Sequence, residues 1–356
     1  MRKAIFTTLA AGAFILAGCT KTEVTEVSDS RAISFSNHVT NAVKSIDKLE
    51  DLKTFYVYGA HTNGQEVFNG DAVSFSNGEW TYNPTRYWDE TKSAYKFAAY
   101  TDNNKTVNNP ENVEFTYSSG HLTITDYTVN NSPIDGSDLL YAVGHNGTDY
   151  VFNGNAHSEV QLEFKHILSK VTFNFSKAAD LNGVEIEVSD IKIEAYNQGT
   201  FIGNTPSTAS QYALNCWAPS GPKSYIAFAD FSLTGSATEE TSKNKQTRVF
   251  LPQDLGETTT AYNIVFTINY SNTINDDGTI DNTQKDQTKE FTCTIAGTED
   301  GKWNPGYSYT YTAEINSTNL EGLYPIVFTV SYGDWNAETV DDIIIDNEKG
   351  QESSHL

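Results

Sequence analysis

Hydrophobic and polar residues alternate one for one along most of this chain. In the segment 170–175, Val171, Phe173 and Phe175 are separated by polar residues. The same period of two recurs in three later segments, 263–270, 307–315 and 325–332. Successive side chains of a strand point to opposite faces, so each segment predicts a strand with one buried and one hydrated face. Such strands are typical of antiparallel sheets that pack against a second sheet.

Turn signals separate the predicted strands at short intervals. Typical examples are the Asn-Gly, Asp-Gly and Asn-Pro-Gly sequences at 69–70, 277–278 and 304–306. About seven or eight candidate strands precede residue 157, and a similar number follow it. The sequence therefore predicts an all-β protein of two tandem antiparallel β-sandwiches at 32–157 and 158–340. They meet in a loop near 154–158, and a polar tail at 341–356 follows them.

One segment departs from the period of two. Val43, Ile46, Leu49 and Leu52 recur every third residue. This spacing predicts a short helix just before the strand that starts near residue 54.

The N-terminal residues have the pattern of an export signal. Arg2 and Lys3 precede an apolar run at 4–17, which is shorter than the roughly 20 residues that span a bilayer. The run ends in Leu-Ala-Gly-Cys and resembles the lipobox of bacterial lipoproteins, which implies a signal peptide at 1–18 and acylation, for example with palmitate, of Cys19. The alternative is an ordinary secretory signal with a chance cysteine. Residues 19–31 are polar and are interpreted as a tether or propeptide.

The amino-acid composition argues against two classes of protein, nucleic-acid-binding proteins and disordered proteins. The chain of 356 residues has 46 acidic and 23 basic residues, so its formal charge is −23. A polyanion repels nucleic acid phosphates, so we expect no nucleic acid partner. Aromatic residues make up 12% of the chain, which argues for a packed core and against a disordered chain.

Candidate chemistry is sparse. The chain has no HExxH, GxSxG, CxxC or phosphate-binding glycine motif, and its seven histidines are scattered. We therefore predict no enzyme, no cofactor and no metal site. His166 lies between two apolar runs and is predicted to hydrogen-bond at a domain junction. The segment 273–278 resembles part of a calcium loop but lacks its bidentate glutamate, and we interpret it as a hydrated turn.

Two cysteines and one tryptophan leave further options open. Cys216 and Cys293 could form a disulfide after export, or could remain a buried reduced pair. Trp217 lies in a predicted loop rich in proline and glycine, and it is the candidate for an exposed contact.

Several segments in a fixed order resemble the fimbrillin family, the lipoprotein pilins of type V pili and their Mfa-like relatives. These segments are ISFSNH, LKTFYVYGA, RYWDETKSAYKFAAY, DLLYA, LEFKHILSKVTF, KWNPGYSYTYTAEI and VSYGDW, between about residues 32 and 335. The resemblance implies two transthyretin-like sandwiches, an outer-membrane lipid-anchored precursor and an extracellular fimbrium that supports adhesion and biofilm formation. It also implies strand exchange with other pilin subunits and contact with a receptor on a host or bacterial surface.

The family resemblance further implies that a protease cuts after a basic residue near the N-terminus and thereby removes a strand. Arg31 is the favoured cut site, Lys44 is the alternative, and an anchor subunit would not be cut. A C-terminal donor strand would use Val340, Ile343 and Ile345, but Asp341 and its acidic neighbour interrupt the alternation. The interruption favours a tip or accessory subunit over a stalk subunit. The alternative function is a glycan-binding surface lipoprotein anchored in the outer membrane.

Overall fold

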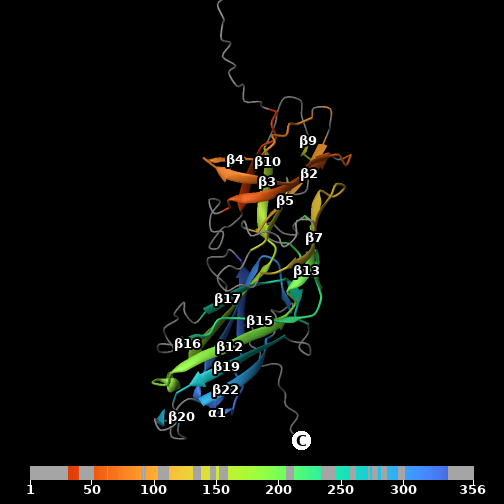
Figure 1. Ribbon diagram of the computed structural model, residues 1–356. Coiled ribbons are helices and arrows are strands. Elements are labelled where there is room, and N and C mark those ends of the chain that lie inside the picture. Colours follow the sequence, from red (N-terminus) through yellow and green to blue (C-terminus); the bar gives the residue numbers. More distant parts are fainter. Residues whose placement is uncertain are drawn as a thin grey trace, which may run out of the picture.

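The computed structural model confirms the all-β prediction (Figure 1). It describes residues 31–39, 52–61, 63–89, 91, 94–102, 112–130, 138–144, 150–151, 159–205, 212–233, 245–256, 262–271, 273–274, 280–281, 287–295 and 301–335. In Figure 1, β2, β3, β5 and β10 lie in the upper part, β7 and β13 lie in the middle, and β12, β19 and β22 lie in the lower part.

The upper part is built on an eight-stranded sheet of order β1-β10-β8-β5-β2-β3-β4, with β9 paired to β5. Its strands are β1 (Phe35–Val39), β2 (Thr54–His61), β3 (Glu66–Ser76), β4 (Glu79–Thr81), β5 (Ala94–Thr101), β8 (Leu140–Val143), β9 (Tyr150–Val151) and β10 (Val160–His166). Strands β5 and β8 are buried on both faces, so their sequences are apolar except at Lys96 and Thr101 and do not alternate.

The lower part is a sandwich of two sheets. One sheet has the order β17-β11-β24-β25; the other has the order β15-β12-β19-β22, with β16 also paired to β12. The strands are β11 (Ser169–Lys177), β12 (Ile186–Ala195), β15 (Ser224–Ala227), β16 (Phe231–Leu233), β17 (Lys245–Phe250), β19 (Tyr262–Tyr270), β22 (Gln287–Ile295), β24 (Tyr307–Ile315) and β25 (Thr329–Asp334). The predicted inward side chains Val171, Phe173 and Phe175 are fully buried between these sheets.

A third sheet joins segments from both halves of the sequence. It has the order β14-β13-β7-β6, built from β6 (Val113–Thr116), β7 (His121–Thr128), β13 (Gln198–Ile202) and β14 (Trp217–Ser220). The ladders of β7 with β13 and of β8 with β10 therefore both cross the predicted border at 157/158. The division into 32–157 and 158–340 stays a prediction.

Short elements complete the described residues. They are the helix α1 (Ser317–Glu321), the 3-10 helices η4 (Ala179–Leu181) and η5 (Leu214–Cys216), and the two-residue strands β18 (Gln253–Asp254), β20 (Thr273–Ile274), β21 (Ile280–Asp281) and β23 (Lys302–Trp303). Of the helix predicted at 43–52, only Leu52 lies within the described residues, where it is buried. No helix in the described ranges is long and apolar enough to cross a membrane.

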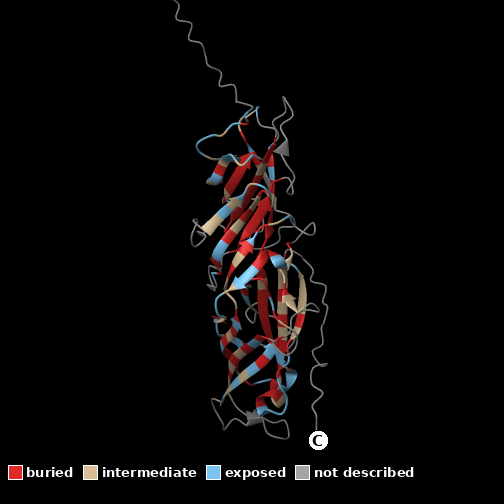
Figure 2. Ribbon diagram, turned by 90° about the vertical axis from the view of Figure 1, so that its right-hand side faces the viewer, coloured by how far each residue is buried: buried red, intermediate tan, exposed pale blue. Residues whose placement is uncertain are grey.

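The buried side chains form three clusters. Figure 2 shows buried positions along the strands of both parts of the molecule. One cluster fills the lower sandwich, and the other two cover opposite faces of the upper sheet, because neighbouring residues such as Val57 and Tyr58 belong to different clusters. The cluster that includes Phe35 lies beneath β1 and β10.

Candidate functional site

Strand β1 forms one edge of the upper sheet and pairs in parallel with β10. Phe35 is opposite Val160 in this ladder and is 5% exposed. Its ring centroid lies 5.4 Å from that of Phe68, 5.9 Å from Phe55 and 6.3 Å from Phe97. An edge strand thus contributes a central side chain to the core, worth about 1.5–3 kcal/mol for the apolar area alone.

The residues just before β1 are fixed by hydrogen bonds to the segment 82–88. The Trp88 backbone N–H donates to the Arg31 carbonyl oxygen at 2.9 Å, and the Ile33 N–H donates to the Arg86 carbonyl at 2.9 Å. The Tyr82 hydroxyl donates to the Ile33 carbonyl at 2.7 Å. The Arg31 side chain is exposed, but its peptide bond to Ala32 lies at the start of a paired segment.

The surface beneath β1 is suited to an extended apolar segment. Val160, Leu162 and Phe164 of β10 all point into the same core cluster as Phe35 and are fully buried. Loss of β1 would leave the outer backbone groups of β10 without their ladder partners and would remove the Phe35 ring from this cluster. Another extended chain could satisfy both needs at once.

A second cluster lies where β10 leads into β11. His166 Nδ1 is 2.6 Å from Asp138 Oδ2, and the His166 ring stacks on the Trp335 indole with 4.6 Å between centroids. Lys170 Nζ lies 5.3 Å from the Trp335 ring centroid. The Trp335 backbone N–H donates to the Gly306 carbonyl at 2.7 Å. The sequence suggested a polar partner for His166, and the structure identifies it as Asp138.

This junction cluster, defined by Asp138, His166, Lys170, Gly306 and Trp335, combines four of the segments that carried the family resemblance. They are DLLYA, LEFKHILSKVTF, KWNPGYSYTYTAEI and VSYGDW. Sequence reasoning treated them as separate strands with aromatic residues. The contact between these segments explains why two of them contain a polar residue, Asp138 and His166. A buried imidazole and a buried carboxylate each need a polar partner.

The prediction that Trp217 is an exposed contact is wrong. Its side chain is 5% exposed and packs near Tyr127 and Phe201. The indole Nε1 donates a hydrogen bond to the Ile167 carbonyl at 2.5 Å. The surrounding residues form the edge strand β14, whose pairing with β13 places the indole in the core between two sheets. The glycan-binding alternative thereby loses its candidate residue.

The two described cysteines are free and buried in different clusters. Burial raises the pKa of Cys216 to about 12 and that of Cys293 to about 11. Protonated, inaccessible thiols of this kind are unreactive. The disulfide option is therefore not realised in this structure.

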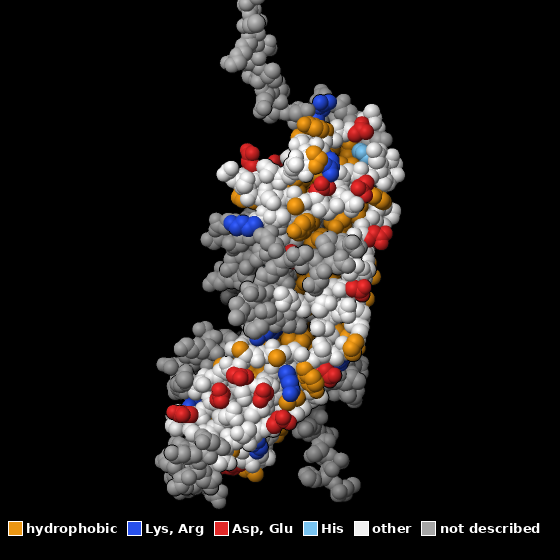
Figure 3. Space-filling view, in the orientation of Figure 1, with side chains coloured by type: hydrophobic (Ala, Val, Ile, Leu, Met, Phe, Trp, Pro, Cys, Tyr) orange, Lys and Arg blue, Asp and Glu red, His pale blue; other side chains and the backbone are white. Residues whose placement is uncertain are grey.

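Several predicted site residues lie outside the described residues: Cys19, Lys44, Val340, Ile343 and Ile345. Their roles stay predictions. Within the described ranges, no group of three or more His, Cys, Asp or Glu side chains is placed to hold a metal ion. On the face shown in Figure 3, acidic side chains are scattered from the upper to the lower part.

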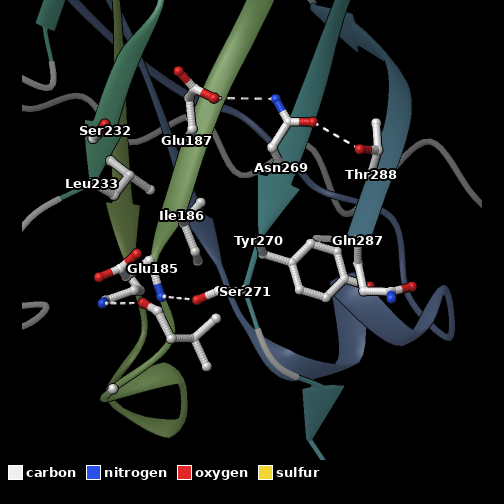
Figure 4. A pocket seen from close by; sticks show the side chains of 13 residues that line it. Glu185, Ile186, Glu187, Ser232, Leu233, Asn269, Tyr270, Ser271, Gln287 and Thr288 are labelled. Carbon is white, nitrogen blue, oxygen red and sulfur yellow. Dashed lines mark hydrogen bonds between the residues drawn. The ribbon is translucent and has the colours of Figure 1, made fainter. Parts of the chain in front are cut away.

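A cavity of about 900 Å³ lies in the lower part of the molecule, near the ends of β12, β19 and β22 (Figure 4). Its polar lining groups are bonded mainly to one another. Asn269 Nδ2 donates to Glu187 Oε2 at 3.4 Å, and Thr288 Oγ1 donates to Asn269 Oδ1 at 2.9 Å. These bonds link three neighbouring strands across the sheet. They account for these polar lining residues as support for the sheet.

Comparisons with known proteins place this arrangement among surface appendage proteins. A family model described as fimbrillin-like matches residues 39–335. A crystal structure of a fimbrial protein from Bacteroides vulgatus is 16% identical, with a TM-score of 0.54, and the match covers 86% of this chain and 99% of that one.

Two further solved structures are more distant. The fimbrial anchor protein Mfa2 from Porphyromonas gingivalis is 11% identical, with a TM-score of 0.38, and the match covers 86% of this chain and 96% of that one. A fimbrial assembly protein from Parabacteroides distasonis is 10% identical, with a TM-score of 0.43, and the match covers 84% and 95% of the two chains. No curated protein sequence matches this chain significantly.

Proposed function

This chain belongs to the fimbrillin-like family, and from that premise we propose that it is a structural and adhesive fimbrium subunit assembled by strand complementation at β10. The observation that carries the proposal is the position of Phe35, a core side chain supplied by a short edge strand. A strand from a neighbouring subunit would replace β1, pair with the backbone of β10 and fill the space of Phe35.

The cut site decides how β1 is released. Residues 40–51 connect β1 to the body of the chain at Leu52. A cut after Arg31 would free the proposed lipid anchor, but β1 would stay covalently attached through this connection. A cut after Lys44 would leave β1 held by its ladder and by side-chain packing alone. Arg31 remains our favoured site for detachment from the membrane, and Lys44 is the site that would also allow β1 to leave.

The N-terminal segment suggests how the precursor is held at the membrane, and the C-terminal segment suggests its position in the filament. We propose that the precursor is held at the outer membrane by acyl chains on Cys19, which delay assembly until the protease acts. We also propose a tip or accessory position. The donor candidates Val340, Ile343 and Ile345 are interrupted by carboxylates, so this chain accepts a strand more readily than it donates one, and self-assembly of the pure protein needs a high concentration.

Limited trypsin treatment of the exported chain without its lipidated cysteine, residues 20–356, tests this function. We expect multimers that resist SDS without boiling, and N-terminal sequencing should identify Ala32 or Ser45 as the first residue. The variants Arg31→Gln and Lys44→Gln are matched controls, each of which removes one cut. A product that is cut at both sites yet remains monomeric at high concentration would contradict strand complementation.

A further inference from the structure

Two edge strands of the lower sandwich each carry a cation that points between the sheets. Arg248 of β17 is directly opposite Val171 of β11, and directly paired residues point to the same face. Lys289 of β22 is likewise opposite the fully buried Ile268 of β19. Strand β17 is at one end of its sheet and β22 is at the end of the other sheet.

Arg248 is almost completely buried, with 5% of its surface exposed. Its guanidinium carbon lies 5.1 Å from the centroid of the Phe228 ring, a member of the sandwich core. Its Nη1 donates to the Thr247 carbonyl at 2.8 Å, whereas no described residue accepts a bond from Nε or Nη2. Burial lowers the pKa of this guanidinium, as expected for a cation enclosed by apolar groups.

Lys289 has the corresponding position on β22. Its Nζ donates to the Leu320 carbonyl at 3.1 Å and lies 5.7 Å from the centroid of Phe291. The ammonium group thus lies between β22 and the helix α1, next to an aromatic ring that packs on the core. An apolar strand added here would remove this charge from the solvent that it still contacts.

The upper sheet differs at its β1 edge. The inward residues Ile33, Phe35, Val160, Leu162 and Phe164 are all apolar and at most 5% exposed. A strand that replaces β1 therefore meets no charge on this face. Inward-pointing charges on edge strands are a known means by which sheets resist the addition of further strands.

We propose that Arg248 and Lys289 are specificity-determining residues that protect the β17 and β22 edges of the lower sandwich from foreign strands and so favour strand exchange at β10. The proposal rests on the function proposed above, since it concerns where an exchanged strand can enter. A strand on the β22 edge would remove Lys289 from the solvent, and a strand on the β17 edge would move the already buried Arg248 still further from water. Neither cation would gain a matching carboxylate, which is unfavourable in a protein interior. These two edges are therefore protected from strand addition.

The test uses the exported chain without any protease, so that it does not depend on the maturation cut. The double variant Arg248→Met, Lys289→Met replaces both cations with an unbranched, flexible apolar side chain. We expect the soluble multimer fraction, measured by size-exclusion chromatography with light scattering, to rise at least tenfold over wild type at equal concentration. Near-UV circular dichroism would report whether the chain remains folded.

Two controls isolate the role of position and charge. Arg248→Lys, Lys289→Arg keeps both charges and should remain monomeric. Lys192→Met removes a cation from the central strand β12 and should also remain monomeric. A folded, monomeric Met double variant overturns the proposal, and so does a variant that multimerises only after losing its near-UV signal. If the wild-type chain fails to multimerise after trypsin treatment, that outcome counts against the proposed function. It does not change the comparison between the Met double variant and the wild type, which is made without protease.

Discussion

The imidazole of His166 lies parallel to the indole of Trp335, with 4.6 Å between ring centroids and 5° between ring planes. His166 ends β10 of the upper sheet, and Trp335 directly follows β25 of the lower sandwich. Asp138, two residues before β8, contacts the imidazole, with 2.6 Å between Oδ2 and Nδ1. One stacked pair therefore fixes the end of the lower sandwich against the upper sheet.

We expect this pair to be energetically coupled. Trp335→Ala should lower the free energy of unfolding by about 3–5 kcal/mol, because it removes a large buried side chain. In a double-mutant cycle with His166→Ala, the coupling energy should be about 0.5–1.5 kcal/mol, as for other ring pairs. Urea unfolding monitored by fluorescence measures both quantities.

The control cycle pairs His166→Ala with Trp303→Phe. Trp303 is buried in the lower sandwich near Phe250 and Tyr262. The changes in the free energy of unfolding caused by Trp303→Phe and by His166→Ala should be additive within about 0.5 kcal/mol, as expected for sites that share no contact. If the Trp335 cycle were equally additive, the stack would be a consequence of packing without its own stabilising effect.

The sequence predicted the fold class well, because alternation reports directly on which face of a strand is buried. The stripe of Val171, Phe173 and Phe175 is an example. Alternation carries no information on which strands are neighbours, so the pairing of β7 with β13 across 157/158 was not predictable. Trp217 was placed wrongly because proline and glycine near an indole are typical of loops, whereas here they lie in or beside the edge strand β14.

Phe35→Ala should weaken the attachment of β1. The loss of a buried phenyl ring should lower the free energy of unfolding by about 3–5 kcal/mol if β1 unfolds together with the body. The matched control is Ser34→Ala at an exposed position, with an expected effect within about 0.5 kcal/mol.

After trypsin treatment, multimers of Phe35→Ala should form faster than those of the wild type, because β1 leaves more readily. An unchanged assembly rate would argue that β1 is not the strand that is replaced.

Trp217 should affect stability and not ligand binding. Trp217→Phe keeps an aromatic ring but leaves the Ile167 carbonyl without its donor, which should cost about 1–3 kcal/mol. Trp217→Ala should cost more, about 3–5 kcal/mol. Affinity electrophoresis in polysaccharide gels should show the same mobility shift, if any, for wild type and Trp217→Phe. A selective loss of glycan binding in folded Trp217→Phe would restore the role that its burial excludes.

The two buried thiols should make stability fall at high pH. The pKa of Cys216 is raised to about 12 and that of Cys293 to about 11, from an ordinary value of 9.0. Below pH 9 both thiols are protonated in the folded and unfolded chain, so they add no pH dependence. Between pH 9 and 11 the unfolded chain loses these protons while the folded chain keeps them, and the free energy of unfolding should therefore decrease. The double variant Cys216→Ala, Cys293→Ala should show a smaller decrease over the same range in urea titrations.

At pH 8 the exported chain should react with a thiol reagent only after unfolding. Two rapidly reacting thiols in the folded chain would contradict the burial of both cysteines.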